Sequence, residues 1–262
     1  MLKKLVTGAV FAGLAAGLVA VLLQFAFVQT LILQSELYES GAMDHFAVRG
    51  AGHEAIHGAG QGSTQMMSLE EAAGGAPKAG GSENQYEHGH DHHDGEEPTY
   101  MRNGLSVVFS IFTYAGFGLM MMAAFAFAAE RGVLITARSG LLWGLSGFVA
   151  VQFAPAFGLP PEVPGNAAAD ITIRQIWWFS TVAATIVGIA LIAFGRNVLQ
   201  WGLAVVVLLL PHVIGAPHPG EYWGSAPPEL AAAYAARTLG VGLVAWLVLG
   251  FTAGYFWAQD ES

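Results

Sequence analysis

The densest group of chemically reactive side chains lies between residues 88 and 94. The run reads His88-Gly89-His90-Asp91-His92-His93-Asp94. Neutral imidazole nitrogens bind cobalt, nickel, copper and zinc well, and neighbouring carboxylates add oxygen ligands. This run therefore predicts capture of a divalent transition metal. A solvated acidic linker is the alternative interpretation.

A second histidine motif, His53-Glu54-Ala55-Ile56-His57, has the spacing of zinc proteases. In those enzymes two histidines one helical turn apart hold zinc, and the glutamate acts as the base. That chemistry needs a stable helix, but glycines flank the motif on both sides, and Ser63 occupies the position of a third histidine. We therefore expect no protease, and no enzymatic activity is predicted for the chain.

Five further residues could line the mouth of a metal pathway. His212 and His218 are also candidate metal ligands, and Glu162, Asp170 and Glu221 are possible pathway or mouth residues. His212 follows Pro211 at the edge of an apolar stretch, and an ionisable residue in that position is a functional hypothesis by default. The alternatives are an interfacial histidine bonded to a carbonyl group, and a structural ion pair between Asp170 and Arg174.

Two glutamines, Gln24 and Gln29, interrupt the first apolar stretch. They could line a polar path through the protein. They could also form hydrogen bonds between helices, which is the commoner role of such residues in membranes.

The elements that must position these side chains are six apolar stretches without a lysine, arginine, aspartate or glutamate. They cover residues 5–33, 103–129, 139–157, 175–195, 197–214 and 238–259. A helix needs about 20 apolar residues to cross a bilayer. The chain is 54% hydrophobic and only 11% charged, which is far from the composition of soluble domains. The sequence predicts an all-α integral membrane protein with about six transmembrane helices in three hairpins.

Three regions follow from this pattern. Residues 1–33 form the first transmembrane helix, residues 34–102 a long acidic outer loop, and residues 103–259 a helical membrane bundle. The outer loop holds 12 carboxylates, three basic residues and seven of the nine histidines, and its composition predicts a flexible, largely disordered segment. No cluster of basic residues points to nucleic acid, and the absence of cysteine excludes thiolate metal sites.

Basic residues near the ends of the stretches predict the orientation. With the N-terminus in the cytoplasm, that face holds Lys3, Lys4, Arg131, Arg138 and Arg196. Cytoplasmic loops carry an excess of lysine and arginine, so both termini are expected to be cytoplasmic, in the inner (plasma) membrane.

Two later stretches share a short pattern. Trp143-Gly144-Leu145 opens one and Trp201-Gly202-Leu203 the other, and each stretch later contains a proline, Pro155 or Pro211. A parallel internal repeat is a known way of building transporters, with the binding site between the repeats. Chance similarity in a biased composition is the alternative.

Several longer motifs together resemble the CbtA family of predicted cobalt-transporter subunits. They are Gly-Leu-Ala-Ala-Gly-Leu at residues 13–18, Leu33-Gln-Ser-Glu36-Leu-Tyr38-Glu39, Gly140-Leu-Leu-Trp143-Gly144-Leu-Ser-Gly147, Gly158-Leu-Pro-Pro-Glu162-Val-Pro164-Gly165, Arg174-Gln175-Ile-Trp177-Trp178 and Leu210-Pro211-His212-Val-Ile-Gly215-Ala-Pro217. The likeness covers nearly the whole chain and includes the histidine-rich loop.

This resemblance implies metal uptake with Co²⁺ as the transported ion, commonly beside a small membrane partner, CbtB. Ni²⁺ or Zn²⁺ could replace Co²⁺ as cargo, since affinity follows the metal as much as the site. No organic cofactor is expected. A different role remains open, that of a non-transporting membrane subunit that binds metal and delivers it to a partner permease.

Overall fold

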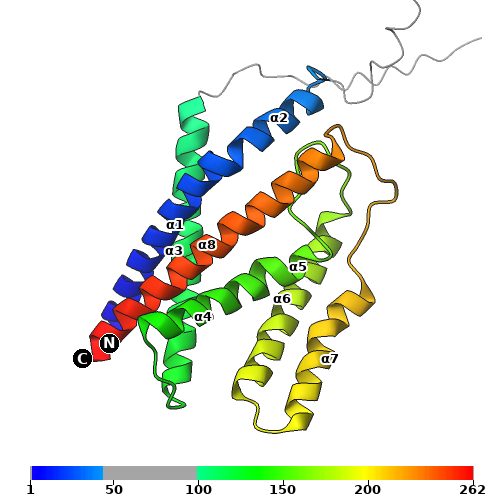
Figure 1. The fold of residues 1–262 in the computed structure, drawn as a ribbon. Coiled ribbons are helices and arrows are strands. Elements are labelled where there is room, and N and C mark those ends of the chain that lie inside the picture. The colour runs from blue at the N-terminus through cyan, green and yellow to red at the C-terminus, as the bar shows by residue number, and fades with distance from the viewer. Residues whose placement is uncertain (1, 44–98, 262) are drawn as a thin grey trace, which may run out of the picture. The chain divides into compact units, whose positions relative to one another are not determined.

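The structure is a computed structural model that describes residues 2–43 and 99–261, which form helices and the turns between them (Figure 1). The helices are α1 (Leu2–Phe27), α2 (Gln29–Glu39), α3 (Thr99–Ala129), α4 (Ala137–Phe148), the π-helical turn η1 (Val149–Phe153), α5 (Ala154–Ala156), α6 (Ile171–Phe194), α7 (Val198–Ile214) and α8 (Pro228–Glu261). The histidine-rich run 88–94 and the motif at 53–57 lie outside the described residues.

Five of these helical segments are long and apolar enough to cross a membrane. They are Leu5–Phe27, Met101–Ala129, Ala137–Ala156, Ile171–Phe194 and Pro228–Gln259. The all-helical membrane protein expected from the sequence is therefore confirmed at this level. Helix α7 is apolar but has only 17 residues, so a sixth span stays a prediction.

Two helices begin earlier in the chain than the charge-free stretches predict. In both, a residue suited to the start of a helix sets the boundary. Helix α6 begins at Ile171, because the Asp170 carboxylate accepts hydrogen bonds from the backbone N–H groups of Thr172 and Ile173. Helix α8 begins at Pro228, well before the stretch that starts at residue 238, since proline suits the first helical position.

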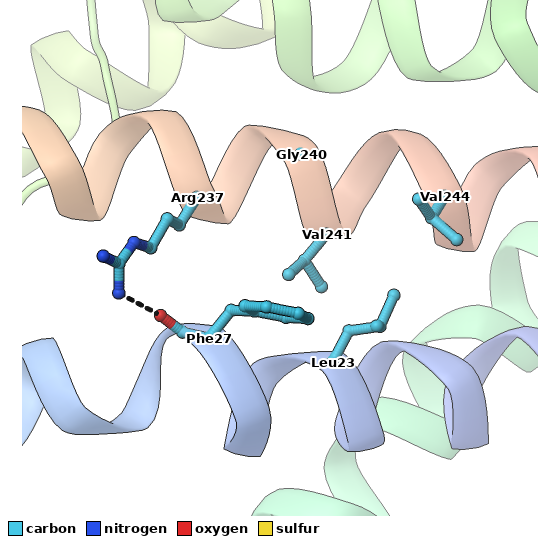
Figure 2. Close-up of a pocket in the computed structure, with 6 residues that line it drawn as sticks. All are labelled: Leu23, Phe27, Arg237, Gly240, Val241 and Val244. Atoms are coloured by element: carbon cyan, nitrogen blue, oxygen red, sulfur yellow. Dashed lines mark hydrogen bonds between the residues drawn. The ribbon is translucent and has the colours of Figure 1, made fainter.

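The first apolar stretch is divided at Val28 into α1 and α2, where a single helix was expected. The Phe27 carbonyl accepts a hydrogen bond of 3.1 Å from the Arg237 guanidinium of α8, as Figure 2 shows. The Leu31 N–H, which would bond that carbonyl in a continuous helix, instead donates to the Val28 carbonyl. A contact from a distant helix therefore accompanies the break.

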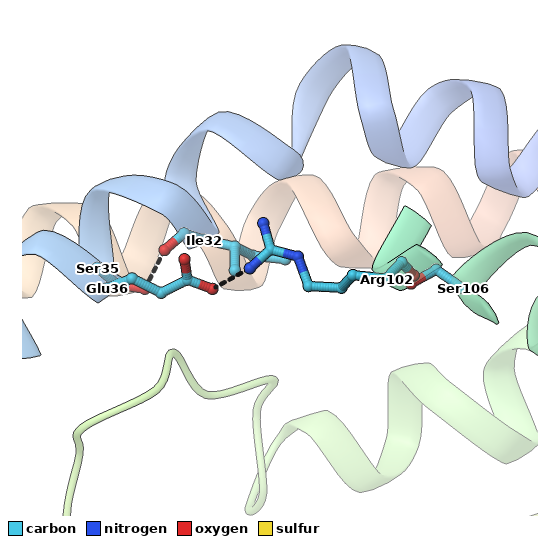
Figure 3. Close-up of polar contacts among 5 residues, drawn as sticks. All are labelled: Ile32, Ser35, Glu36, Arg102 and Ser106. Atoms are coloured by element: carbon cyan, nitrogen blue, oxygen red, sulfur yellow. Dashed lines mark hydrogen bonds and ion pairs between the residues drawn. The ribbon is translucent and has the colours of Figure 1, made fainter. Parts of the chain in front are cut away.

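Helices α1 and α3 lie antiparallel with their backbones in close contact. A Cβ atom on Gly13 would overlap the backbone of Ala115, and one on Gly17 would meet Ile111. The spacing of these two glycines is a known device for close helix packing in lipid, where van der Waals contact drives association. At the far end of this pair, Glu36 of α2 and Arg102 of α3 form an exposed ion pair of 3.5 Å (Figure 3).

Helices α4 and α8 cross in the same manner, again antiparallel. Gly140 and Gly144 of α4 face Gly250 and Gly254 of α8, and a Cβ atom on any of them would overlap backbone atoms of the other helix. Helix α1 also packs on α8, and the core of α1, α3, α4 and α8 includes the buried Phe125. Four helices thus form one closely packed group.

Helices α6 and α7 form an antiparallel pair joined by a short turn. Here Gly188 of α6 faces the side chain of Leu208, so the contact is between backbone and side chain. The indole N–H of Trp177 donates a hydrogen bond of 3.2 Å to the Pro211 carbonyl. This pair positions His212, the residue that follows Pro211.

Candidate functional site

The connections at one end of the bundle carry the predicted mouth residues. We call this the distal end; it contains the segment 157–170 between α5 and α6 and the segment 215–227 between α7 and α8. The two segments pair through an antiparallel bridge between Asn166 and Gly224. The Ala167 N–H donates 2.8 Å to the Trp223 carbonyl. Backbone hydrogen bonds therefore hold the two connecting segments of the distal end together.

Glycines make this junction possible. Gly165 has a φ of +80°, a conformation that side-chain-bearing residues rarely adopt, and it lies against Ser225 and Glu39. Gly215 ends α7 with a φ of +89° and turns the chain into the second segment. The end of α2 thereby contacts the first connecting segment.

His212 lies in the last turn of α7 and is partly buried. Its ring is edge-on to the rings of Phe157 and Trp177, with centroid separations of 6.0 Å to each. Aromatic neighbours hold the imidazole in place through packing. His212 is thus fixed at the distal end by apolar contacts.

The other mouth residues have separate roles in the structure. Glu162 forms an ion pair of 2.7 Å with Arg174, and Asp170 caps α6. Arg174 therefore pairs with Glu162, in place of the Asp170–Arg174 pair considered from the sequence. His218 is exposed, with its ring 6.4 Å from that of Tyr222, and Glu221 is exposed as well.

No metal-binding group is assembled at this mouth. Across residues 2–43 and 99–261, no three histidine, aspartate or glutamate side chains come close enough to hold a metal ion. Two of the three predicted carboxylates have structural roles, since Glu162 forms an ion pair and Asp170 caps a helix. The metal-binding mouth therefore stays a prediction. The histidine-rich run lies outside the described residues.

Gln24 and Gln29 flank the break between α1 and α2, and both are partly buried. The Gln24 carbonyl accepts the Val28 N–H at 2.9 Å, and Gln29 begins α2. Beside them, Leu23, Phe27, Arg237, Gly240, Val241 and Val244 line a groove of about 250 Å³ between α1 and α8 (Figure 2). Its walls are apolar, apart from the guanidinium at one end.

A glutamine outside the predicted set, Gln152, has its side-chain oxygen buried inside the bundle without a hydrogen-bond partner. Its signal in the sequence is weak. It is the one amide side chain between residues 139 and 157, three positions before Pro155. Only the packing of α8 against η1 reveals that its oxygen is enclosed.

A family model described as "Probable cobalt transporter subunit (CbtA)" matches residues 2–258. The chain belongs to the CbtA family. The match spans nearly all of the chain and confirms the resemblance drawn from the motifs. No curated protein and no solved structure matches it.

Membership in the CbtA family makes the chain a membrane protein and a subunit of a probable cobalt transporter, and cobalt is the ion that the family description names. A subunit implies at least one partner. The apolar helices supply the membrane part of that assembly.

Proposed function

We propose that the chain is the membrane subunit of an uptake transporter for divalent transition metal, with Co²⁺ as the cargo and Ni²⁺ or Zn²⁺ as possible substitutes. The histidine-rich run 88–94 captures the ion outside the membrane. The observation that carries the proposal is the combination of a cobalt-transporter family match with a bundle whose described ionisable groups form no metal site. We therefore assign capture to the histidine-rich segment outside the described residues.

The histidine-rich run is the best source of that capture. His88, His90, His92 and His93 supply imidazole nitrogens, and Asp91 and Asp94 supply carboxylate oxygens. Binding needs neutral imidazole and ionised carboxylate, so capture weakens as the pH falls below about 6. The ion then passes His212 and His218 at the distal end.

The orientation follows from the charges at the other end of the bundle. Lys3 lies in the first turn of α1, Arg131 in the turn between α3 and α4, Arg138 at the start of α4, and Arg196 between α6 and α7. These basic residues support a cytoplasmic location for that end of the bundle and for both termini. Helix α7 then completes a six-span topology in the plasma membrane, and the distal end faces outward.

A second function is a metal-binding scaffold that delivers the ion to a partner permease. One observation favours it. Within the five candidate spans the only aspartate, glutamate or histidine is Glu229, in the first turn of α8. Many ion pathways carry acidic residues inside the membrane, and these spans do not. A small CbtB-like membrane protein is the partner in either case, and neither function involves an enzymatic step or an organic cofactor.

Uptake of radioactive cobalt by cells that carry or lack the gene tests the transport proposal. Replacing His88, His90, His92 and His93 with alanine should remove most of the gene-dependent uptake. The matched control replaces His45, His53 and His57 in the same loop and should retain it. Equal uptake by the quadruple variant and the unchanged protein would refute capture by residues 88–94.

Reconstitution in lipid vesicles separates the two functions. Metal uptake by the purified chain alone excludes a pure scaffold, whereas uptake only with a partner supports one. The double change His212→Ala and His218→Ala should reduce uptake where the chain transports. Unchanged uptake would remove the proposed mouth.

A further inference from the structure

Helix α8 carries an arginine, Arg237, directly before its apolar part. The charge-free residues 238–259 of this helix extend about 33 Å at a rise of 1.5 Å per residue. That length matches the hydrocarbon core of a bilayer, which is about 30 Å thick. Helix α8 begins at Pro228, next to the distal end. Arg237 therefore lies on the distal side, where the hydrocarbon ends and the polar headgroups begin.

Helix α1 ends its apolar part at the same level. Its span Leu5–Phe27 has 23 residues and is about 35 Å long. The Arg237 guanidinium bonds the carbonyl of the last residue of that span, Phe27. Near the other end of the two helices, a Cβ atom on Gly8 would meet the side chain of Phe256. The two apolar segments thus lie side by side, and both mark the level of Arg237 as an edge of the hydrocarbon.

An apolar groove leads from the guanidinium along this apolar part. Leu23 and Phe27 of α1 line one side, and Gly240, Val241 and Val244 of α8 line the other, around a volume of about 250 Å³ (Figure 2). Phe27 is 52% exposed and Val244 is 42% exposed, so the groove is open at the surface of the protein. It follows α8 for about two turns toward the middle of the membrane.

The glycine at position 240 keeps the groove open. A Cβ atom built on Gly240 would have no neighbouring atom within 4 Å. The other glycines in this half of α8 and beyond, Gly242, Gly250 and Gly254, differ, because a Cβ atom on each would overlap a group from α4 or η1. Gly240 therefore makes no close contact between helices, and the absence of its side chain leaves free space in the groove.

Arg237 has hydrogen-bond donors to spare. A guanidinium group carries five N–H donors. Among the described residues, the Arg237 side chain forms one hydrogen bond, of 3.1 Å to the Phe27 carbonyl, and no carboxylate pairs with it. Arg102 and Arg174, in contrast, each have a glutamate partner. An anion next to Arg237 would satisfy the remaining donors and neutralise the charge.

We propose that Arg237 and this groove form a binding site for a phospholipid of the leaflet on the distal side. The phosphodiester of the lipid accepts charge-assisted hydrogen bonds from the guanidinium, and one acyl chain lies in the groove against Phe27 and Val244. Charge and position favour this occupant, because a phospholipid joins an anion to a hydrocarbon chain at the level where the guanidinium meets the groove. The site is separate from metal transport and does not depend on it.

Thermal unfolding of the purified full chain in dodecyl maltoside, followed by tryptophan fluorescence, tests the site. Phosphatidylglycerol should raise the melting temperature, because a ligand that binds the folded state stabilises it. Diacylglycerol, which has the chains without the phosphate, should give a smaller rise. Glycerophosphate, which has the phosphate without the chains, should give none. Equal rises with phosphatidylglycerol and diacylglycerol would overturn the site.

Two substitutions remove the two parts of the site. Gly240→Leu fills the groove and should remove most of the rise that phosphatidylglycerol causes. Without lipid it should melt no lower than the wild type, since leucine favours a helix more than glycine does, and this shows that the variant folds. Arg237→Gln should raise the lipid concentration that gives half of the rise by about tenfold, because the phosphate loses its charged donor.

Each substitution has a matched control outside the groove. Gly202→Leu adds the same side chain to α7, where a Cβ atom also has no neighbour within 4 Å. Arg131→Gln removes an arginine that likewise donates to a helix carbonyl, that of Phe127, at the other end of the bundle. Both controls should keep the full response to phosphatidylglycerol. If each control responds as its groove counterpart does, the lipid acts as a general solvent and the site is overturned.

A helix of the small membrane partner is the competing occupant of the groove. Co-purification of the chain with that partner, made with and without Gly240→Leu, tests this occupant. If Gly240→Leu abolishes co-purification while its response to phosphatidylglycerol equals that of the wild type, the groove holds a protein helix and the lipid site is overturned. None of these measurements uses metal, so their outcome is independent of the transport proposal.

Discussion

The tripeptide Trp-Gly-Leu occurs in the middle of α4 and near the start of α7, in different physical surroundings. Gly144 of α4 lies against the Trp246 carbonyl of α8, whereas nothing lies near a Cβ atom built on Gly202 of α7. Trp143 packs edge-on against Phe125 at 5.4 Å, but Trp201 is 50% exposed. The likeness in sequence therefore does not carry over to packing.

The two prolines differ in the same way. Pro155 follows a π-helical turn that packs against α8, while Pro211 lies within an α-helix and offers its carbonyl to Trp177. Backbones of α4 and α8 come into direct contact at Gly140, Gly144 and Gly250. Between α6 and α7, in contrast, Gly188 faces the side chain of Leu208. The comparison shows that contact with another helix, more than the local motif, determines how tightly a residue is packed.

The strongest test of this comparison adds one methyl group at each of the two matched glycines, Gly144 and Gly202. Gly144→Ala should destabilise the protein by about 2–3 kcal/mol, because the new Cβ overlaps a backbone oxygen that cannot rotate away. Gly202→Ala should be neutral or stabilising by up to about 1 kcal/mol through helix propensity. Thermal unfolding in detergent measures both. Equal effects would show that the two glycines are equivalent after all.

A methyl group in the α6–α7 pair should cost less. Gly188→Ala meets the side chain of Leu208, which can change rotamer, so we expect a loss of about 1 kcal/mol. The same unfolding assay applies, and Gly188→Ala combined with Leu208→Ala should recover part of the loss. A cost as large as that of Gly144→Ala would contradict the distinction between the two interfaces.

Removing the hydrogen bond between α6 and α7 tests their single buried polar link. Trp177→Phe keeps the aromatic ring but loses the donor to the Pro211 carbonyl, at an expected cost of about 1 kcal/mol or less. The cost is moderated because the Gly215 N–H still bonds that carbonyl. Trp201→Phe, at an exposed position, is the control and should leave the melting temperature unchanged.

The smallest effect is expected at the distal surface. Glu162→Gln removes the ion pair with Arg174, and both side chains are partly exposed, so the loss should be about 0.5 kcal/mol. Raising the salt concentration should shrink the difference between variant and wild type. If Glu162→Gln instead abolished cobalt uptake at unchanged stability, Glu162 would be a pathway residue.

Much of the fold could be predicted from the sequence because of a simple rule: a helix that crosses lipid is a long apolar stretch without charged residues. The charge-free stretches at 103–129 and 139–157 correspond closely to α3 and to the α4–α5 segment. The rule misplaced the start of α8, since Arg237 ended the charge-free stretch although the helix continues to Pro228. Propensity and proline placement, rather than hydropathy, set that boundary.

The candidate site was less predictable, because its residues are not recognisable by type. Histidine and carboxylate are conspicuous in a sequence, but Glu162 and Asp170 serve an ion pair and a helix cap. Gln152 is inconspicuous, and its buried side-chain oxygen lies against a glycine ninety positions away. Nothing local to residue 152 indicates that neighbour.

The sequence by itself determined the class of protein, the approximate position of most helices and the concentration of imidazoles at residues 88–94. These follow from composition and length, since each apolar segment must satisfy its own backbone within lipid. Only the tertiary structure decided where α1 breaks and which polar atoms are left without partners. Arg237 competes for the Phe27 carbonyl, and Gly242 admits the Gln152 amide. Both depend on groups that the fold brings together from far along the chain.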